Sequence, residues 1–119
     1  MSPSKFILAV ACTFCAHGAR AQVLYANAHE LFVDAIRTGA ASGVMTGEIA
    51  EHFTRQFHST GTLFADARVI APLIQPDCRR LEVILRKADV ATPTGTQAVT
   101  MTAKLNYCLD GKPPGTEGE

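Results

Sequence analysis

CRRLEVILRK at residues 78–87 and TAKLNYCLDG at residues 102–111 decide how this chain folds, because each combines a strand-like run with one cysteine. If the two runs pair as antiparallel strands with Cys78 opposite Cys108, one face of the hairpin is apolar except for Lys87, and the other is polar except for Ile84. The apolar face pairs Leu81 with Leu105, Val83 with Ala103 and Leu85 with Met101. Because successive side chains point to opposite faces of a strand, a shift of one residue would destroy this separation. The sequence therefore predicts an antiparallel hairpin in this register.

The two cysteines of this hairpin are predicted to form a disulfide. Directly opposed residues of antiparallel strands have Cα atoms about 4.5 to 5.5 Å apart, which is within the range that a disulfide spans. A redox site would need a C-x-x-C motif and a zinc site closely spaced cysteines or histidines, and neither surrounds Cys78 or Cys108. A bridge that closes a loop of about 30 residues should stabilise the fold by about 3 to 4 kcal/mol.

The first 21 residues have the layout of a secretory signal peptide. Lys5 precedes an apolar run from Phe6 to Ala16, and small residues lead to an A-x-A cleavage site that ends at Ala21. A membrane anchor fits less well, because it needs about 20 apolar residues. Lipidation at Cys12 would leave a very short apolar segment, and the sequence leaves this alternative open. We expect cleavage of 1–21, and no stable membrane anchor afterwards.

Removal of residues 1–21 changes the composition of the chain. Of 119 residues 98 remain, with 9 basic against 11 acidic side chains, because Lys5 and Arg20 leave with the signal. No run of lysines or arginines survives, so we expect no nucleic-acid partner. Only Cys78 and Cys108 remain of the four cysteines, and an even pair in an exported protein favours a disulfide. A chain of this length forms one domain with one modest core.

Two segments of the N-terminal half have helical spacing. Apolar residues from Tyr25 to Ile36 predict a helix over about Val23–Thr38, which ends at Gly39 and the small residues up to Gly43. In TGEIAEHFTRQFHSTG at residues 46–61, an apolar residue at every fourth position predicts a second helix, with Thr46 as N-cap and Gly61 as stop. We expect the aromatic core residues to be Tyr25, Phe32, Phe53 and Phe57.

Alternating apolar residues from Leu63 to Val69 predict a third strand, which ends before Pro72. The predicted fold class is therefore α+β: two N-terminal helices packed on a three-stranded antiparallel sheet with one cross-strand disulfide. The single domain should cover residues 22–110. The loop at residues 89–97 is predicted to project as a mobile segment, and the tail at residues 111–119 to be disordered.

The sequence supports no catalytic, metal or cofactor site. His29 and His52 lie on predicted helices, but the H-E-x-x-H spacing of a zinc protease is missing. His58 is followed by Ser59 without the G-x-S-x-G motif of a nucleophile elbow. Asp66 and Glu82 could act as an acid–base pair, but surface ion pairing on a solvated sheet face explains them better. We therefore expect that the protein is not an enzyme.

The residues best suited to bind a partner lie around the predicted hairpin. Arginines and a lysine place positive charge along the first strand. A tyrosine precedes the second cysteine, and two prolines follow it. These candidate contact residues are Arg79, Arg80, Arg86, Lys87, Tyr107, Pro113 and Pro114. A solvated strand edge and an unstructured tail are the alternative explanation for the same residues.

The strings QPDCRRLEV (75–83) and LNYCLDGKPP (105–114), together with the signal peptide, resemble small exported proteins of conjugation gene clusters in Gram-negative bacteria. The resemblance covers about the last 45 residues and does not extend to the helical half. It implies a periplasmic accessory or assembly protein of a type IV secretion apparatus, without catalytic residues to assign. The implied partner is a protein of the cell envelope.

Two functions follow from the sequence. The first is a periplasmic, non-catalytic protein that acts by protein–protein contact in a conjugative apparatus. The second is a small secreted binding or inhibitor domain that uses the loop at residues 89–97. The chain alone leaves the identity of the partner and the oligomeric state open.

Overall fold

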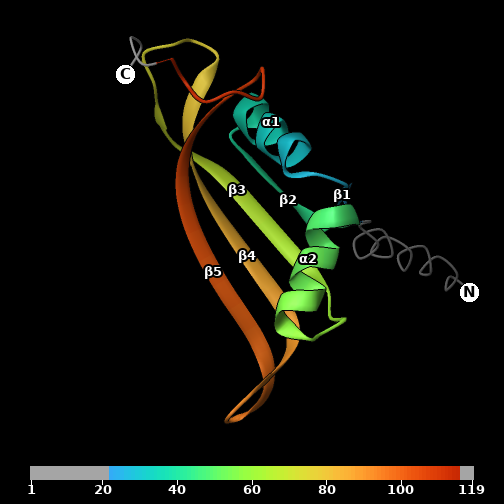
Figure 1. The fold of residues 1–119 in the computed structure, drawn as a ribbon. Helices are drawn as coiled ribbons and strands as arrows, with labels where there is room; N and C mark the ends of the chain where they lie inside the picture. Colours follow the sequence, from blue (N-terminus) through green and yellow to red (C-terminus); the bar gives the residue numbers. More distant parts are fainter. Residues whose placement is uncertain (1–21, 116–119) are drawn as a thin grey trace, which may run out of the picture.

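The computed structural model describes residues 22–115, so the predicted signal peptide and residues 116–119 of the predicted tail lie outside the described residues. The elements of this part are β1 (Leu24–Tyr25), α1 (Ala28–Thr38), β2 (Ala40–Met45), α2 (Gly47–Phe57), β3 (Leu63–Pro72), β4 (Cys78–Thr92) and β5 (Gly95–Cys108) (Figure 1). The α+β fold class with two helices is confirmed. No helix within this range is long and apolar enough to cross a membrane.

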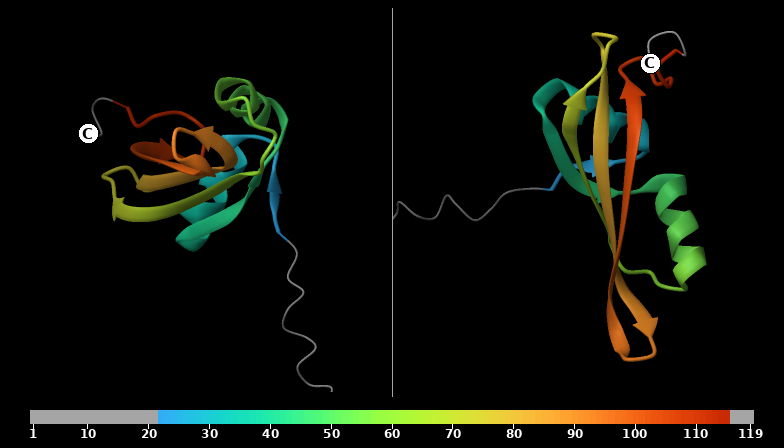
Figure 2. Two further views of the ribbon diagram at one scale, coloured as in Figure 1. Left: turned by 90° about the horizontal axis from the view of Figure 1, so that it is seen from below. Right: turned by 90° about the vertical axis from the view of Figure 1, so that its left-hand side faces the viewer.

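The strands form one five-stranded sheet in the order β1-β2-β3-β4-β5. β1 runs parallel to β2, and the other neighbours are antiparallel. The predicted arrangement, two helices followed by a three-stranded antiparallel sheet, is therefore wrong, because the sheet is mixed and the helices alternate with strands. The strands twist strongly, and α1 and α2 lie beside different ends of the sheet (Figures 1 and 2).

The segment predicted as one helix from Val23 begins as a strand. Leu24 and Tyr25 pair with β2, and Asn27 then caps α1 by accepting a hydrogen bond from the Glu30 backbone N–H at 3.0 Å. Gly39 ends α1 in the left-handed conformation with φ 99°, which glycine adopts without steric cost. α1 therefore starts at its capping residue, Asn27, rather than at the first apolar residue.

The small residues after α1 form β2 instead of a helix terminus. Gly43 lies against the buried ring of Tyr25, and a Cβ at this position would be 2.7 Å from the Tyr25 Cε2 atom. Such a distance is shorter than any ordinary van der Waals contact. The absence of a side chain at Gly43 thus lets Tyr25 pack across β2 and holds β1 at the edge of the sheet.

The β4–β5 hairpin has the predicted register. Cys78 pairs with Cys108, Leu81 with Leu105 and Lys87 with Val99. The disulfide between Cys78 and Cys108 is present, with 4.0 Å between the Cα atoms. The prediction of a bridge across paired strands is confirmed.

The predicted loop at residues 89–97 is wrong, because both strands continue through most of it. β4 reaches Thr92 and β5 starts at Gly95, so only two residues connect them. A bulge after Lys87, where Asp89 adopts φ 59°, shifts the pairing so that Val90 faces Gln97. The hairpin extends beyond the start of β3, because Leu63, the first residue of β3, pairs with Lys87 (Figure 2).

The core lies between the sheet and α1. Its buried members are Tyr25, Leu31, Ala35, Met45, Leu63, Ala65, Ala67, Leu81 and Val83. Of the predicted aromatic core residues, Phe32 and Phe53 are partly buried against this cluster, and Phe57 stacks on Phe53 with 6.1 Å between ring centroids. No residue of α2 is fully buried, so α2 is held less tightly than α1.

The hydroxyl of the buried Tyr25 has a charged partner. The hydroxyl donates a hydrogen bond to Oδ2 of Asp34 at 2.8 Å. Burial, followed by the hydrogen bond and the negative charge of Asp34, raises the pKa of Tyr25 to about 12 from 10.0. Ionisation of Tyr25 is therefore unfavourable in the folded protein.

This raised pKa predicts a loss of stability at high pH. The unfolded tyrosine ionises near pH 10, so the contribution of Tyr25 is complete below about pH 10 and is lost between about pH 10 and 12. We expect the difference in unfolding free energy between the wild type and Tyr25→Phe to shrink over this range, as measured by urea denaturation. Tyr107, whose pKa is raised by burial and by the charge of Asp110, is present in both proteins and cancels. A constant difference up to pH 12 would contradict the prediction.

Candidate interaction surface on the outer face of the sheet

The predicted contact residues do not form one patch. Arg80 and Arg86 lie on the same face of β4, whereas Lys87 belongs to the opposite face and is only 1% exposed. Arg79 is at the disulfide end of β4 and donates hydrogen bonds to the carbonyls of Pro76 and Cys78, at 2.7 and 2.8 Å. Of the three cations after Arg79, only Arg80 and Arg86 are therefore placed to meet a partner.

Tyr107 packs under the start of α1. Its hydroxyl and Nδ1 of His29 are 2.8 Å apart, and its ring meets Phe32 edge-on with 4.8 Å between centroids. Gly111 lies close to the His29 ring, because a Cβ there would be 3.3 Å from Cε1. Tyr107 thus joins the end of β5 to α1, which gives it a structural role.

Of the two candidate prolines, Pro113 lies next to the disulfide, whereas Pro114 does not line this region. Together with Gln75 and Lys112, Pro113 lines a hollow over Cys78 and Cys108. Gln75 accepts a hydrogen bond from the Gly115 backbone N–H at 3.2 Å, so the described part of the predicted tail is in contact with the loop before β4. The disorder predicted for residues 111–119 stays a prediction, since residues 116–119 are outside the described range.

The surface that remains open is the face of the sheet opposite the core, which we call the outer face. It consists of the strand residues that alternate with the core positions. In β2 to β5 they include Ser42, Val44, Phe64, Asp66, Arg68, Arg80, Glu82, Ile84, Arg86, Thr100, Thr102, Lys104 and Asn106. Both helices pack against the other face of the sheet. Lys87 belongs to that face and donates a hydrogen bond to Thr54 of α2.

The two carboxylates of the outer face already have partners. Glu82 forms an ion pair with Arg68, whose Nε lies 2.7 Å from Oε1, and Asp66 accepts a hydrogen bond from the Ser42 hydroxyl. Of the surface ion pairing predicted for Asp66 and Glu82, only that of Glu82 is found among residues 22–115. An acid–base pair is not formed, because Asp66 and Glu82 are engaged separately.

The two arginines of β4 on the outer face, Arg80 and Arg86, have no carboxylate partner within residues 22–115. Arg80 donates to Oδ1 of Asn106 at 2.9 Å, and the Arg86 guanidinium lies over the Phe64 ring, 4.2 Å from its centroid. Among residues 22–115, the Arg68–Glu82 contact is the only ion pair. The guanidinium groups of Arg80 and Arg86 thus keep hydrogen-bond donors for another molecule.

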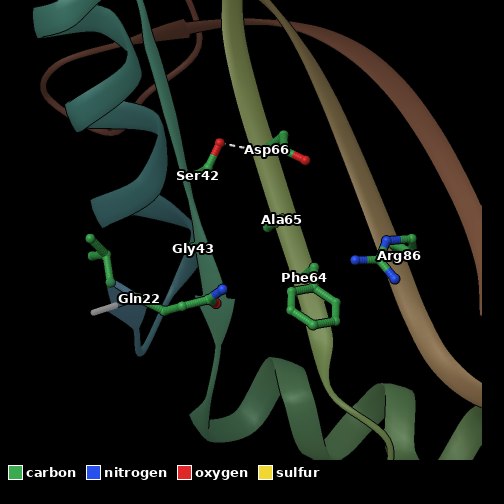
Figure 3. Close-up of a pocket in the computed structure, with 8 residues that line it drawn as sticks. Gln22, Ser42, Gly43, Phe64, Ala65, Asp66 and Arg86 are labelled. Atoms are coloured by element: carbon green, nitrogen blue, oxygen red, sulfur yellow. Dashed lines mark hydrogen bonds between the residues drawn. The ribbon is translucent and has the colours of Figure 1, made fainter. Parts of the chain in front are cut away.

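A hollow of about 510 Å³ opens on the outer face beside Arg86. Its lining combines the Phe64 ring, the Asp66 carboxylate, Ser42 and the segment at Gln22 and Val23 (Figure 3). Arg86 and Asp66 come from the neighbouring strands β4 and β3, and both line the hollow. Its mixture of charged, polar and aromatic groups suits side chains of a partner better than a buried apolar ligand.

The sequence alone does not reveal this site, because the site depends on the β3–β4 register. Phe64 faces Arg86 and Asp66 faces Ile84 only when Leu63 pairs with Lys87. No cysteine pair marks this register, so the signal that fixed β4 and β5 was missing here. The alternation of apolar and polar residues along Leu63–Arg68 was the only available indication.

The other candidate residues have structural partners. Ser59 is buried and its hydroxyl donates to the carbonyl of Ala88 at 2.9 Å, while His58 ends α2 with φ 53°. In the described part of the chain, no three histidine, cysteine, aspartate or glutamate side chains gather where they could hold a metal ion. Ser59 and His58 therefore fix the end of α2.

Comparisons with known proteins give no further assignment. No protein-family model matches the chain, and neither a curated protein nor a solved structure matches it. The function must therefore be argued from the outer face and from the sequence.

Proposed function

We propose that this protein is a non-catalytic, periplasmic accessory protein of a conjugative type IV secretion apparatus, and that it binds another envelope protein through the outer face of its sheet. The observation that supports contact on this face is that Arg80 and Arg86 share it without a carboxylate partner within residues 22–115. Proteins commonly use such arginines, beside an aromatic ring, to anchor partners.

The compartment is supported by two features. A disulfide between Cys78 and Cys108 suits an oxidising environment such as the periplasm. The signal-like residues 1–21 would deliver the chain there. The link to conjugation rests on the resemblance of QPDCRRLEV and LNYCLDGKPP, which surround the two cysteines.

Crosslinking in the native host tests the proposal. A photoreactive residue replaces Ile84 on the outer face, and in the matched control it replaces the exposed Gln56 of α2. We expect position 84 to crosslink to a component of the secretion channel or pilus, identified by mass spectrometry, and position 56 not to. Crosslinks from both positions to unrelated periplasmic proteins, or none from either, would refute the proposal.

The projecting β4–β5 hairpin favours a second function, that of a small binding or inhibitor domain. Its tip is ordered by Thr92, whose hydroxyl donates to the carbonyl of Gly95 at 2.6 Å and accepts from the Gln97 amide at 3.1 Å. If the tip binds the target, replacing Pro93 and Thr94 by Asn-Gly, which favours a two-residue turn, should abolish binding and leave the fold intact. An unchanged crosslinking pattern after this replacement would exclude the second function.

A further inference from the structure

The outer face of the sheet carries an excess of positive charge, and the helices carry an excess of negative charge. The outer face has four cations, Arg68, Arg80, Arg86 and Lys104, against two carboxylates, Asp66 and Glu82. The exposed charges of the helices have the opposite balance, with Glu30, Asp34, Glu48 and Glu51 against Arg37 and Arg55. A negatively charged partner is therefore attracted to the outer face and repelled from the helices.

The two unpaired arginines have a defined spacing. Arg80 and Arg86 are six residues apart on one strand, and at about 3.3 Å per residue their Cα atoms are roughly 20 Å apart. The contact of Arg86 with Phe64 and the bond of Arg80 to Asn106 restrict both side chains before any ligand binds. Restricted arginines lose less conformational freedom on binding, so they favour carboxylates at a matching distance.

The surface between the two arginines is apolar as well as charged. Ile84 lies between them on β4, and Phe64 lies diagonally across from it on β3, opposite Arg86. Val23 and Leu24 at the adjoining edge are 50% and 66% exposed. A polyanion such as nucleic acid would leave this apolar surface uncovered, whereas a polypeptide can cover it with aliphatic side chains.

We propose that the outer face binds an extended, acidic segment of a partner protein. One carboxylate of this segment pairs with Arg86 above Phe64 and a second with Arg80, and aliphatic side chains between them cover Ile84 and Phe64. Carboxylates six residues apart in an extended chain match the spacing of the two arginines. This inference rests on the proposed function, because it names the kind of partner that the outer face accepts.

A defined peptide tests the inference on the exported, disulfide-bonded protein. The probe is acetyl-Glu-Thr-Val-Thr-Val-Thr-Glu-amide, which places two carboxylates and two valines on one face, and the control peptide has Gln in place of Glu. We expect NMR titration to show shifts at Phe64, Ile84 and Arg86, and about tenfold tighter binding of the Glu peptide. Raising NaCl from about 50 to about 500 mM should remove most of this difference.

Matched variants separate the outer face from general charge effects. The double variant R80Q/R86Q should lose the preference for the Glu peptide, whereas R37Q/R55Q, which removes the same charge from the helices, should keep it. Dispersed NMR spectra will show whether each variant is folded. If a variant does not fold, the salt dependence of peptide binding to the wild type still tests the inference. Equal binding of both peptides, shifts centred on the helices, or tighter binding of heparin or phosphatidylglycerol vesicles would overturn the inference.

The two proposals fail in different ways. If the peptide does not bind but position 84 still crosslinks to a secretion component in the host, the outer face is a contact surface and the acidic-segment inference is wrong. If the peptide binds as expected but no secretion component is crosslinked, the partner chemistry stands and the conjugative role is wrong.

Discussion

The double variant C78A/C108A is expected to lose about 3 to 4 kcal/mol of unfolding free energy. The bridge joins residues that are 30 apart in the sequence, so removing the bridge gives the unfolded chain more conformational freedom. Both cysteines are also almost fully buried in the folded protein. For a domain whose total stability is about 5 to 10 kcal/mol, this is a large share. Urea denaturation followed by circular dichroism measures the loss.

Reduction of the wild type provides the control for this prediction. The reduced protein should unfold at nearly the same urea concentration as C78A/C108A, because both lack the same cross-link. The hairpin tip at Pro93–Thr94 lies at the other end of β4 and β5, so its local stability should change less. A loss below about 1 kcal/mol in both proteins would show that the pairing of β4 and β5 holds the fold without the bridge.

Lys87→Ala is expected to destabilise the protein by about 3 kcal/mol. The Lys87 side chain is 1% exposed and donates to the carbonyl of Gly61 and to Oγ1 of Thr54, the latter at 3.3 Å. No carboxylate pairs with it among residues 22–115. The substitution removes the buried methylenes and leaves the Gly61 carbonyl without this donor, and both effects weaken the attachment of α2 to the sheet.

Lys104 provides a matched control on the same sheet. Lys104→Ala removes an exposed lysine of β5 and should change the stability by less than about 0.5 kcal/mol. Lys87→Met should fall between the two, because methionine retains most of the packing but not the hydrogen bonds. Equal stability of the Lys87→Ala and Lys104→Ala proteins, measured by urea denaturation, would contradict the role assigned to Lys87.

Lys87 contributes to stability because it helps to attach the loop after α2 to β4. The Ser59 hydroxyl donates to the carbonyl of Ala88, and the Ala88 N–H donates to the carbonyl of Thr62 at 2.9 Å. Gly61 approaches β4 so closely that a Cβ would meet the backbone of Ala88. Lys87 therefore belongs to a set of contacts that joins the end of α2 to β4, and it is not available to a partner.

The sequence determined the β4–β5 pairing in advance because two independent signals agree there. The cysteines and the apolar alternation both require Cys78 to face Cys108, and each alone would have left another register possible. The start of the second helix was also predicted correctly, since α2 begins at Gly47 after Thr46, but the helix ends at Phe57 with His58, not Gly61, as its C-cap. A stripe at every fourth position suffices for a helix that has few tertiary contacts.

The tertiary structure alone decided the remainder of the sheet. Residues 40–43 are small and show no apolar alternation, and the segment 40–45 forms β2 because Tyr25 can pack over Gly43. Likewise, Leu24 and Tyr25 resemble the first turn of a helix but pair with β2. Strand pairing between segments distant in the chain depends on which surfaces meet, so local propensity does not predict it.

For the candidate surface, too, the sequence determined part of the arrangement and the tertiary structure decided the rest. The sequence placed Arg80 and Arg86 on one face of a strand and Lys87 on the other, which follows from alternation alone. Only the β3–β4 register brought Phe64 under Arg86 and paired Glu82 with Arg68. What a single strand presents is determined by its own residues, whereas the composition of a sheet face requires the neighbouring strands, whose register is fixed by packing across the whole core.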